Sequence, residues 1–303
     1  MDDIYSLEAH YRRSNDLARQ DPPLTPEQHR IVDSHWGDVT AEPGGVDYLE
    51  RELGGVPVLW AVPAGAEDAP VLLCIHGGGY VGGSVYTHRK MYAHLAKAAG
   101  VRAVLPEYSL TPARQFPTQL DECAAVYGAL LDAGTAAESI GIVGDSAGGG
   151  LTVSVMLRAR ERGWALAAAL VPISPWTDLT QSGASITTNR PTDVLFGGRH
   201  PMDIGGLTGL LLPPDRSPMD ALVSPLFADL KSLPPMYIQV GGAEMLLDDA
   251  VRLHAAALEH GVEAELDVVP GEQHTFQMSA GRTAAADAAI ARAAAWLRGK
   301  LQW

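Results

Sequence analysis

Continuous runs of apolar residues alternate with helical patterns through most of this 303-residue chain. The runs that predict strands are "VLLCI" (71–75), "VRAVL" (101–105), "SIGIV" (139–143), "LAAALVPIS" (166–174), "MYIQV" (236–240) and "AELDVV" (264–269). Helical patterns follow near 88–99, 118–131, 147–162, 248–260 and 283–299. Strands that are apolar on both faces and alternate with helices are typical of a parallel sheet covered by helices on both sides.

The first 62 residues do not follow this alternation. They predict helices at 3–19 and 25–36, the second with Thr25 as its N-cap, Pro26 at its first position and Gln28 completing a capping box. Two strand-like runs, 46–53 and 56–62, then flank Gly54-Gly55 and predict a hairpin. The hairpin adds antiparallel strands at one edge, so we expect a mostly parallel sheet of eight strands in an α/β fold.

The interval from Trp176 to Pro225 contains no strand pattern. About fifty irregular residues are too many for a plain connection between two strands of a compact domain. We therefore expect one domain, 1–303, with a helical cap built from about 1–42 and about 176–225.

Composition and charge narrow the class of protein. The net charge of -14 repels phosphate backbones, so we expect no nucleic-acid partner. No apolar run approaches the ~20 residues of a membrane span, and the opening "MDDIYSLEAHYRR" lacks the regions of a signal peptide. Both favour a cytoplasmic protein. Cys74 and Cys123 are too few for a zinc site of their own, so we expect no metal.

The motif "GDSAG" (144–148) matches G-x-S-x-G and stands between a predicted strand and a predicted helix. A sharp turn there would lift the hydroxyl of Ser146 clear of the sheet, beside the N-terminus of the helix. The same glycines could merely form a tight turn. They do not match the phosphate-binding pattern G-x-x-x-x-G-K-[ST]. Ser146 is therefore a candidate nucleophile.

A serine nucleophile needs a base and an acid that orients the base. His274 follows the last predicted strand, and an acid is expected after the strand before it. Glu244, Asp248 and Asp249 all qualify by charge. We favour Glu244, because the two aspartates fall where the next helix begins and a carboxylate has a structural role.

The loop "HGGG" (76–79) follows the strand 71–75 and predicts an oxyanion hole. Glycines allow backbone N–H groups to approach a substrate without interference from Cβ atoms. We expect the N–H groups of Gly78, Gly79 and Ala147 to serve as the donors. His76 is interpreted as a residue that shapes this loop.

Four segments, "HGGGYVGGS", "GDSAGGG", "SPWTDLT" and "VSPLFADLKSLPPMYIQVG", resemble the hormone-sensitive-lipase-like bacterial carboxylesterases of the α/β-hydrolase fold. The resemblance spans about 47–276 and is strongest to the subgroup with GDSAG at the nucleophile and a branch with Glu as the acid. It implies a triad of Ser146, Glu244 and His274, the oxyanion hole above, a cap, no cofactor, and the option of a homodimer.

Two positions depart from the family pattern. The usual D-Y-R-L-A-P reads "EYSLTP" (107–112), and Thr275 stands where a hydrophobic residue usually follows the histidine. Neither departure removes a member of the triad.

The resulting hypothesis is a serine ester hydrolase that acts on short or medium acyl esters or lactones through an acyl-enzyme. Alternatives are a monoterpene-type lactone hydrolase and a non-catalytic small-molecule receptor on the same scaffold.

Overall fold

The computed structural model describes residues 5–17, 28, 34–197 and 203–302. Eight strands form one sheet in the order β1-β2-β4-β3-β5-β6-β7-β8, which confirms the predicted number. The strands are β1 (Val46–Leu53), β2 (Val56–Pro63), β3 (Val71–Ile75), β4 (Arg102–Pro106), β5 (Ile140–Asp145), β6 (Ala169–Ile173), β7 (Met236–Gly241) and β8 (Ala264–Val269). The hairpin β1–β2 and the pair β2–β4 are antiparallel, and the other neighbours are parallel.

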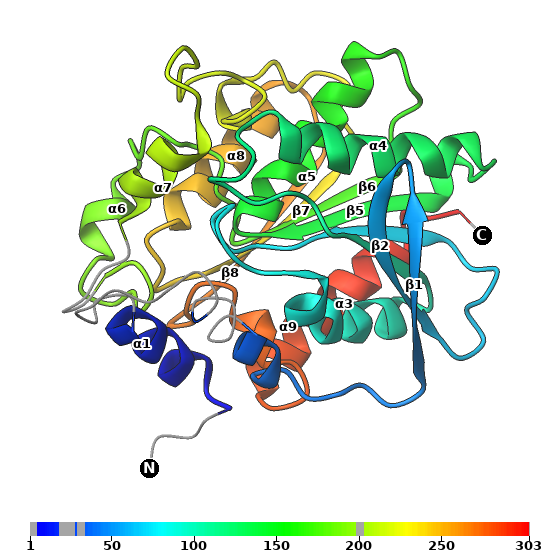
Figure 1. The fold of residues 1–303 in the computed structure, drawn as a ribbon, viewed down its shortest axis with the longest axis horizontal. Helices are drawn as coiled ribbons and strands as arrows, with labels where there is room; N and C mark the ends of the chain where they lie inside the picture. The colour runs from blue at the N-terminus through cyan, green and yellow to red at the C-terminus, as the bar shows by residue number, and fades with distance from the viewer. Residues whose placement is uncertain (1–4, 18–27, 29–33, 198–202, 303) are drawn as a thin grey trace.

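Helices cover both faces of the sheet, as Figure 1 shows. They are α1 (Leu7–Leu17), α3 (Val85–Ala99), α4 (Thr118–Asp132), α5 (Ala147–Glu161), α6 (Ser185–Thr188), α7 (Ile204–Leu211), α8 (Leu247–Glu259) and α9 (Ala284–Arg298). Short 3₁₀ turns are η1 (His35–Asp38), η2 (Ala137–Ser139), η3 (Pro225–Phe227) and η4 (Phe276–Ser279). Helices α3 and α9 pack together on one face, while α4, α5 and α8 lie on the other.

The central strands are buried along their whole length. Every residue of β3, β5, β6 and β7 is buried, as expected for strands that are covered on both faces. The predicted α/β fold is therefore confirmed, and the carboxyl ends of β5, β7 and β8 lie at the same edge of the sheet because these strands are parallel.

Some boundaries differ from the predicted ones for local reasons. Helix α3 begins three residues earlier than expected, because Ser84 caps it: the Ser84 hydroxyl accepts from Thr87 N at 3.2 Å and Thr87 Oγ1 accepts from Ser84 N at 2.9 Å. The capping partner is a threonine rather than Glu or Gln, so the pattern was not recognised. Strand β6 is shorter than the predicted 166–174, because it pairs with β5 only from Ala169 onward.

At the N-terminus, the predicted helix 3–19 is observed as α1 within the described residues. Most of the predicted helix 25–36, including Thr25 and Pro26, lies outside the described residues, and His35–Asp38 forms η1.

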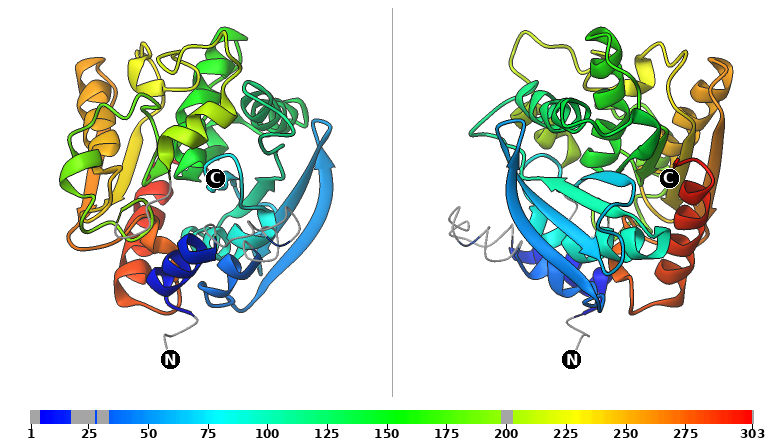
Figure 2. Two further views of the ribbon diagram at one scale, coloured as in Figure 1. Left: turned by 60° about the vertical axis from the view of Figure 1, so that its left-hand side comes forward. Right: turned by 90° about the vertical axis from the view of Figure 1, so that its right-hand side faces the viewer.

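Between β6 and β7, the described residues of 176–225 contain no strand, as predicted. They include the two short helices α6 and α7, which lie beyond the carboxyl ends of the strands (Figures 1 and 2). Among the helices of the described chain, none combines the length and the apolar character that crossing a membrane requires.

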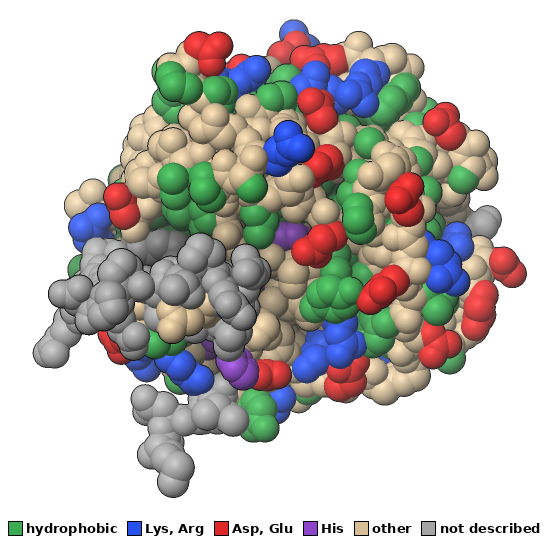
Figure 3. All heavy atoms as spheres, in the orientation of Figure 1, with side chains coloured by type: hydrophobic (Ala, Val, Ile, Leu, Met, Phe, Trp, Pro, Cys, Tyr) green, Lys and Arg blue, Asp and Glu red, His purple; other side chains and the backbone are tan. Residues whose placement is uncertain are grey.

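Charged side chains of both signs are interspersed on the face of the molecule drawn in Figure 3. Acidic side chains predominate toward the side that carries β1, and Lys and Arg form no broad patch on this face. This distribution agrees with the strongly negative net charge of the chain.

Candidate active site

Ser146 lies in the turn between β5 and α5, with a backbone φ of 54° and ψ of -119°. A positive φ is uncommon for a residue with a side chain, and such strain costs about 1–3 kcal/mol. The turn is compact: a Cβ atom at Gly144 would lie 2.2 Å from the Gly148 carbonyl oxygen, and one at Gly148 would lie 2.0 Å from the Ile75 carbonyl oxygen. The two glycines are therefore required by the close approach of strand and helix.

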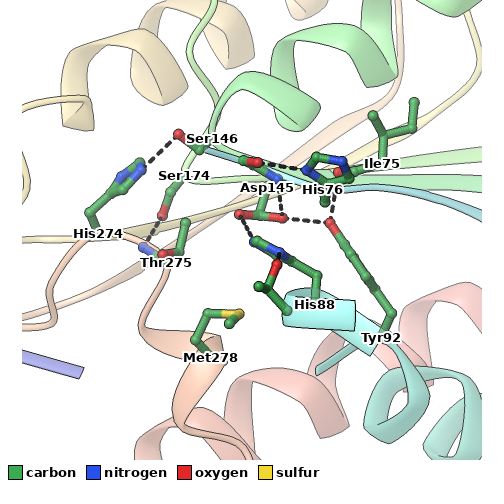
Figure 4. Close-up of polar contacts among 12 residues, drawn as sticks. Ile75, His76, His88, Tyr92, Asp145, Ser146, Ser174, His274, Thr275 and Met278 are labelled. Atoms are coloured by element: carbon green, nitrogen blue, oxygen red, sulfur yellow. Dashed lines mark hydrogen bonds and ion pairs between the residues drawn. The ribbon is translucent and has the colours of Figure 1, made fainter. Parts of the chain in front are cut away.

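Ser146, His274 and Glu244, the three residues predicted to form a triad, lie together, with His274 within contact distance of the other two. His274 Nε2 lies 2.9 Å from Ser146 Oγ, and His274 Nδ1 lies 3.2 Å from Glu244 Oε2. A carboxylate only accepts hydrogen bonds, so Nδ1 carries the proton and Nε2 is free to accept from the serine hydroxyl. Figure 4 shows the His274 ring directed at Ser146.

Burial and pairing set the charges of this trio. Glu244 is fully buried and His274 is 1% exposed, whereas Ser146 is 5% exposed. Burial raises the pKa of Glu244, and its pairing with His274 opposes that shift. Burial alone would lower the pKa of His274, but the Glu244 carboxylate outweighs it, so the pKa of His274 is raised.

The two rival carboxylates, Asp248 and Asp249, form their hydrogen bonds with residues other than His274. Asp249 accepts hydrogen bonds from the backbone N–H groups of Thr177 and Asp178 at 2.7 and 2.8 Å, and Asp248 accepts from Ser185 N at 2.9 Å. They fasten the segment after β6 to the start of α8. The structural role expected for them is therefore observed, although neither is the N-cap, which is Leu246.

The glycine-rich loop after β3 has the backbone form that an oxyanion hole needs. Gly78 and Gly79 have φ values of 111° and 59°, which favour glycine. Within the described part of the chain, the N–H groups of Gly78, Gly79 and Ala147 have no hydrogen-bond acceptor. Ala147 is the first residue of α5, so its N–H has no partner within the helix.

Tyr108 packs against His76, the first residue of this loop, and holds it in place. The rings of His76 and Tyr108 stack with centroids 4.2 Å apart, and the Tyr108 hydroxyl donates to the His76 carbonyl oxygen at 2.8 Å. Burial lowers the pKa of His76 to about 3, so its ring is neutral. His76 thus shapes the loop, and the tyrosine that does so belongs to the variant "EYSLTP" segment.

Asp145 is a fully buried residue that the sequence analysis did not single out, although it occupies the variable position before Ser146. Its Oδ1 accepts from Gly77 N at 3.0 Å and from the Tyr92 hydroxyl at 2.7 Å, and its Oδ2 lies 3.4 Å from His88 Nε2 (Figure 4). Burial alone would raise the pKa of Asp145, but His88 and Tyr92 outweigh it and the pKa is lowered. Asp145, at the end of β5, joins the glycine loop to the strand that leads into Ser146.

Asp193 and Ser174 are two further residues that the sequence did not reveal. Asp193 Oδ2 accepts from Met245 N at 2.6 Å, directly after Glu244. Ser174 Oγ accepts from Thr275 N at 3.1 Å, directly after His274, and the Ser174 hydroxyl also favours the ionised form of Glu244. Both bonds fix the loops that carry Glu244 and His274.

Side chains from the interval 176–225 cover the trio and the glycine loop. The Phe196 ring meets the His274 ring edge-on, with centroids 4.9 Å apart. A Cβ atom at Gly79 would lie 2.8 Å from Leu207 Cδ1, so α7 closes directly over the loop. Phe196 and Leu207 thus place apolar side chains against the His274 ring and the glycine loop.

Metal ligation has no candidate in the described residues, where no group of three or more His, Cys, Asp or Glu side chains is placed to hold an ion. Cys74 and Cys123 are buried free thiols, and burial raises the pKa of each well above its ordinary value.

Comparison with known proteins agrees with this fold. A family described as "alpha/beta hydrolase fold" matches residues 72–278. An acetyl-hydrolase from Streptomyces hygroscopicus is 35% identical over 241 residues, covering 80% of this chain and 78% of the relative. An esterase from Acinetobacter venetianus is 34% identical over 220 residues, covering 72% of this chain and 71% of the relative.

A solved structure gives the same result for the whole chain. The crystal structure of an esterase from the bacterial hormone-sensitive lipase family superposes with a TM-score of 0.90 at 36% identity, covering 98% of this chain and 99% of the other. The chain belongs to the α/β-hydrolase fold family and, within it, to the bacterial hormone-sensitive-lipase-type esterases.

Proposed function

We propose that this protein is a serine carboxylesterase in which Ser146 is the nucleophile, His274 the base and Glu244 the acid. The observation that carries the proposal is the alignment of Ser146 Oγ, His274 and Glu244 through contacts of 2.9 and 3.2 Å, on a strained turn at the carboxyl edge of the sheet. Relatives named acetyl-hydrolase and esterase support the same chemistry.

In the first half-reaction, His274 Nε2 takes the Ser146 proton as Oγ attacks the carbonyl carbon of the ester. Glu244 holds the tautomer and stabilises the imidazolium that forms. The tetrahedral intermediate collapses when the bond from carbon to the alkoxy oxygen breaks, and His274 returns its proton to the departing alcohol. The product is an ester of the acyl group with Ser146.

In the second half-reaction, water attacks the acyl-enzyme and gives its proton to His274. Collapse of the second tetrahedral intermediate breaks the bond to Oγ, Ser146 regains a proton from His274, and the carboxylic acid leaves. Atoms balance with ester and water alone, so the chemistry needs no metal or cofactor.

The negative oxygen of both intermediates would be stabilised by the N–H groups of Gly78, Gly79 and Ala147. Their lack of an acceptor among the described residues supports this role. A single donor of this kind is worth roughly 10²–10³ in turnover. The bond from Gly77 N to Asp145 supports it further, because it fixes the loop relative to Ser146.

The preferred substrate is a short or medium acyl ester, or a lactone, which contains the same group in a ring. Phe196 over His274 and Leu207 over Gly79 limit the room for an acyl chain. The acetyl-hydrolase name of a relative points in the same direction. A cap formed from about 1–42 and 176–225 is part of this proposal, and the homodimer implied by the resemblance stays a prediction.

Replacing Ser146 by Ala should abolish hydrolysis of p-nitrophenyl acetate, because no other described hydroxyl contacts His274 Nε2. We expect kcat to fall at least about 10³-fold, while the fold is retained. Retained turnover in the purified variant, with wild-type circular dichroism, would contradict the proposed function.

Replacing Glu244 by Gln should change the pH dependence as well as the rate. In the wild type, kcat/KM should rise with pH as His274 loses its proton, with a midpoint above the ordinary histidine value of 6.5. Without the carboxylate, burial dominates and lowers the pKa of His274, so the midpoint should move to lower pH while kcat falls roughly 10²–10⁴-fold. An unchanged or higher midpoint would contradict the pairing.

Replacing Asp145 by Asn should lower kcat more than it changes KM. Asn keeps an acceptor oxygen for Gly77 N but loses the negative charge, so the hydrogen bond to Gly77 weakens, and an NH₂ group replaces the oxygen beside His88 Nε2. We expect roughly a tenfold loss in kcat, about the worth of one charged hydrogen bond. Steady-state kinetics with thermal unfolding as a control tests this, and an unchanged kcat would count against Asp145 as a support of the oxyanion hole.

Acyl-chain length provides a test of the cover over the site. Values of kcat/KM on p-nitrophenyl esters should decrease from acetate or butyrate to palmitate, because Phe196 and Leu207 leave little room for a long chain. Equal rates on acetate and palmitate esters would contradict the expected confinement.

A further inference from the structure

Helix α1 lies against the segment that follows β8, as the views in Figures 1 and 2 agree. Its residue Tyr11 is 1% exposed. The Tyr11 hydroxyl is 3.0 Å from the carbonyl oxygen of His274 and 2.5 Å from Thr275 Oγ1. A side chain from the start of the chain therefore contacts the backbone of the candidate base and the residue after it.

The chemistry of these groups fixes the direction of the two hydrogen bonds. The His274 carbonyl can only accept, so the single proton of the Tyr11 hydroxyl is donated to it. Thr275 must then donate its own hydroxyl proton to the Tyr11 oxygen. Burial raises the pKa of Tyr11 well above its ordinary value, so its proton stays in place. The two hydrogen bonds therefore run in one direction: Thr275 donates to Tyr11, and Tyr11 donates to the backbone of His274.

The backbone at Thr275 is unusual and is held from a second side. Thr275 has a φ of 49° and a ψ of 39°, a left-handed conformation that is a rare outlier for a β-branched residue. Its N–H donates to Ser174 Oγ at 3.1 Å. A strained turn immediately after His274 persists only where its surroundings enforce it. The Tyr11 and Ser174 hydroxyls hold it from outside the turn, and Met278 N–H donates to the Thr275 carbonyl oxygen at 2.9 Å from within it.

Helix α1 is also anchored to the segment that covers the site. Asn15 Nδ2 donates to the carbonyl oxygens of Val194 and Leu195 at 3.1 and 2.9 Å. The next residue, Phe196, packs edge-on against the His274 ring. Gln273, just before His274, also accepts from Val194 N at 2.9 Å. Helix α1 therefore sits where the covering segment and the histidine loop meet.

We propose that Tyr11 is a positioning residue for His274, with Thr275 as its hydrogen-bond partner, so that α1 sets where the base lies relative to Ser146. The proposal rests on the proposed function, because it concerns the geometry of that reaction. Loss of the Tyr11 hydroxyl would leave a buried carbonyl and the Thr275 hydroxyl without their partner, and the turn would relax. Small displacements of a base reduce catalysis strongly.

The departure at position 275 from the family pattern agrees with this role. A hydrophobic side chain there could not donate to Tyr11. The Thr275 hydroxyl contacts Tyr11 on α1.

The first experiment is Tyr11→Phe in the full-length protein, since it keeps the buried ring and removes only the hydroxyl. Steady-state kinetics on p-nitrophenyl acetate should show a roughly tenfold fall in kcat with KM nearly unchanged, about the effect of one lost hydrogen bond. The rate of covalent labelling by a fluorophosphonate should fall by the same factor, because it depends on the same base.

The second experiment changes Thr275, the partner of the Tyr11 hydroxyl. Thr275→Val should lower kcat, though by less than Tyr11→Phe, because the Tyr11 hydroxyl can still donate to the His274 carbonyl. Thr275→Ser should recover most of that loss, because serine keeps the donor. The double variant Tyr11→Phe, Thr275→Val should be no slower than Tyr11→Phe alone, since the Thr275 hydroxyl acts on His274 only through Tyr11.

Tyr127→Phe serves as the matched control for stability. The Tyr127 hydroxyl donates to the Ala165 carbonyl at 2.6 Å, on α4 and away from the site. This variant loses a hydroxyl-to-carbonyl bond of the same kind, so it should lower the unfolding temperature while kcat stays at the wild-type value. A positioning role predicts that Tyr11→Phe differs from it in kcat.

Two results would overturn the proposal: Tyr11→Phe with wild-type kcat, or Thr275→Val with the same kcat as Thr275→Ser. The threonine pair decides the question even where Tyr11→Phe fails to fold. Ser146→Ala separates this failure from that of the proposed function. An inactive Ser146→Ala beside a fully active Tyr11→Phe rejects only the positioning role, whereas an active Ser146→Ala rejects the reaction itself.

Discussion

The contact of 2.9 Å between His274 Nε2 and Ser146 Oγ is the interaction on which the rest of this account depends. The two residues are 128 positions apart in the chain, and they meet because β5 and β8 are parallel and end at the same edge of the sheet. The central strands β3, β5, β6 and β7 are fully buried, and a close-packed interior of this kind is stiff, so it can hold the ends of distant strands in a fixed relation. The loops at the strand ends then fix the final positions of the side chains.

The loops are fixed by buried hydrogen bonds to the backbone around Ser146, Glu244 and His274. Asp193 holds the loop after Glu244, Ser174 and Tyr11 hold the turn at His274, and Asp145 holds the glycine loop beside Ser146. Burial makes each such bond costly to leave unmade, which restricts the loops to one arrangement. The same burial raises the pKa of Glu244, and the pairing with His274 opposes that shift.

The sequence was sufficient to predict the eight-stranded sheet and the proximity of Ser146, Glu244 and His274. Continuous apolar strands have no solvent-exposed face, so their pattern is strong, and the order of Ser146, Glu244 and His274 follows from which strand each residue follows. Tyr11 and Asp193 could not be predicted in the same way. Their roles depend on α1 and the interval 176–225 folding back over the strand ends, and no periodicity in the sequence encodes that contact. The start of α3 was missed because Thr87, rather than Glu or Gln, completes the cap at Ser84.

The most direct test of the central claim is to locate the covalent adduct that a fluorophosphonate forms with the folded wild-type protein. Peptide mass spectrometry should find one stoichiometric adduct on the peptide that carries Ser146, and heat-denatured protein should form none. A protein that hydrolyses esters but carries the adduct on another residue, or forms no adduct, would contradict the assignment of Ser146 as the nucleophile.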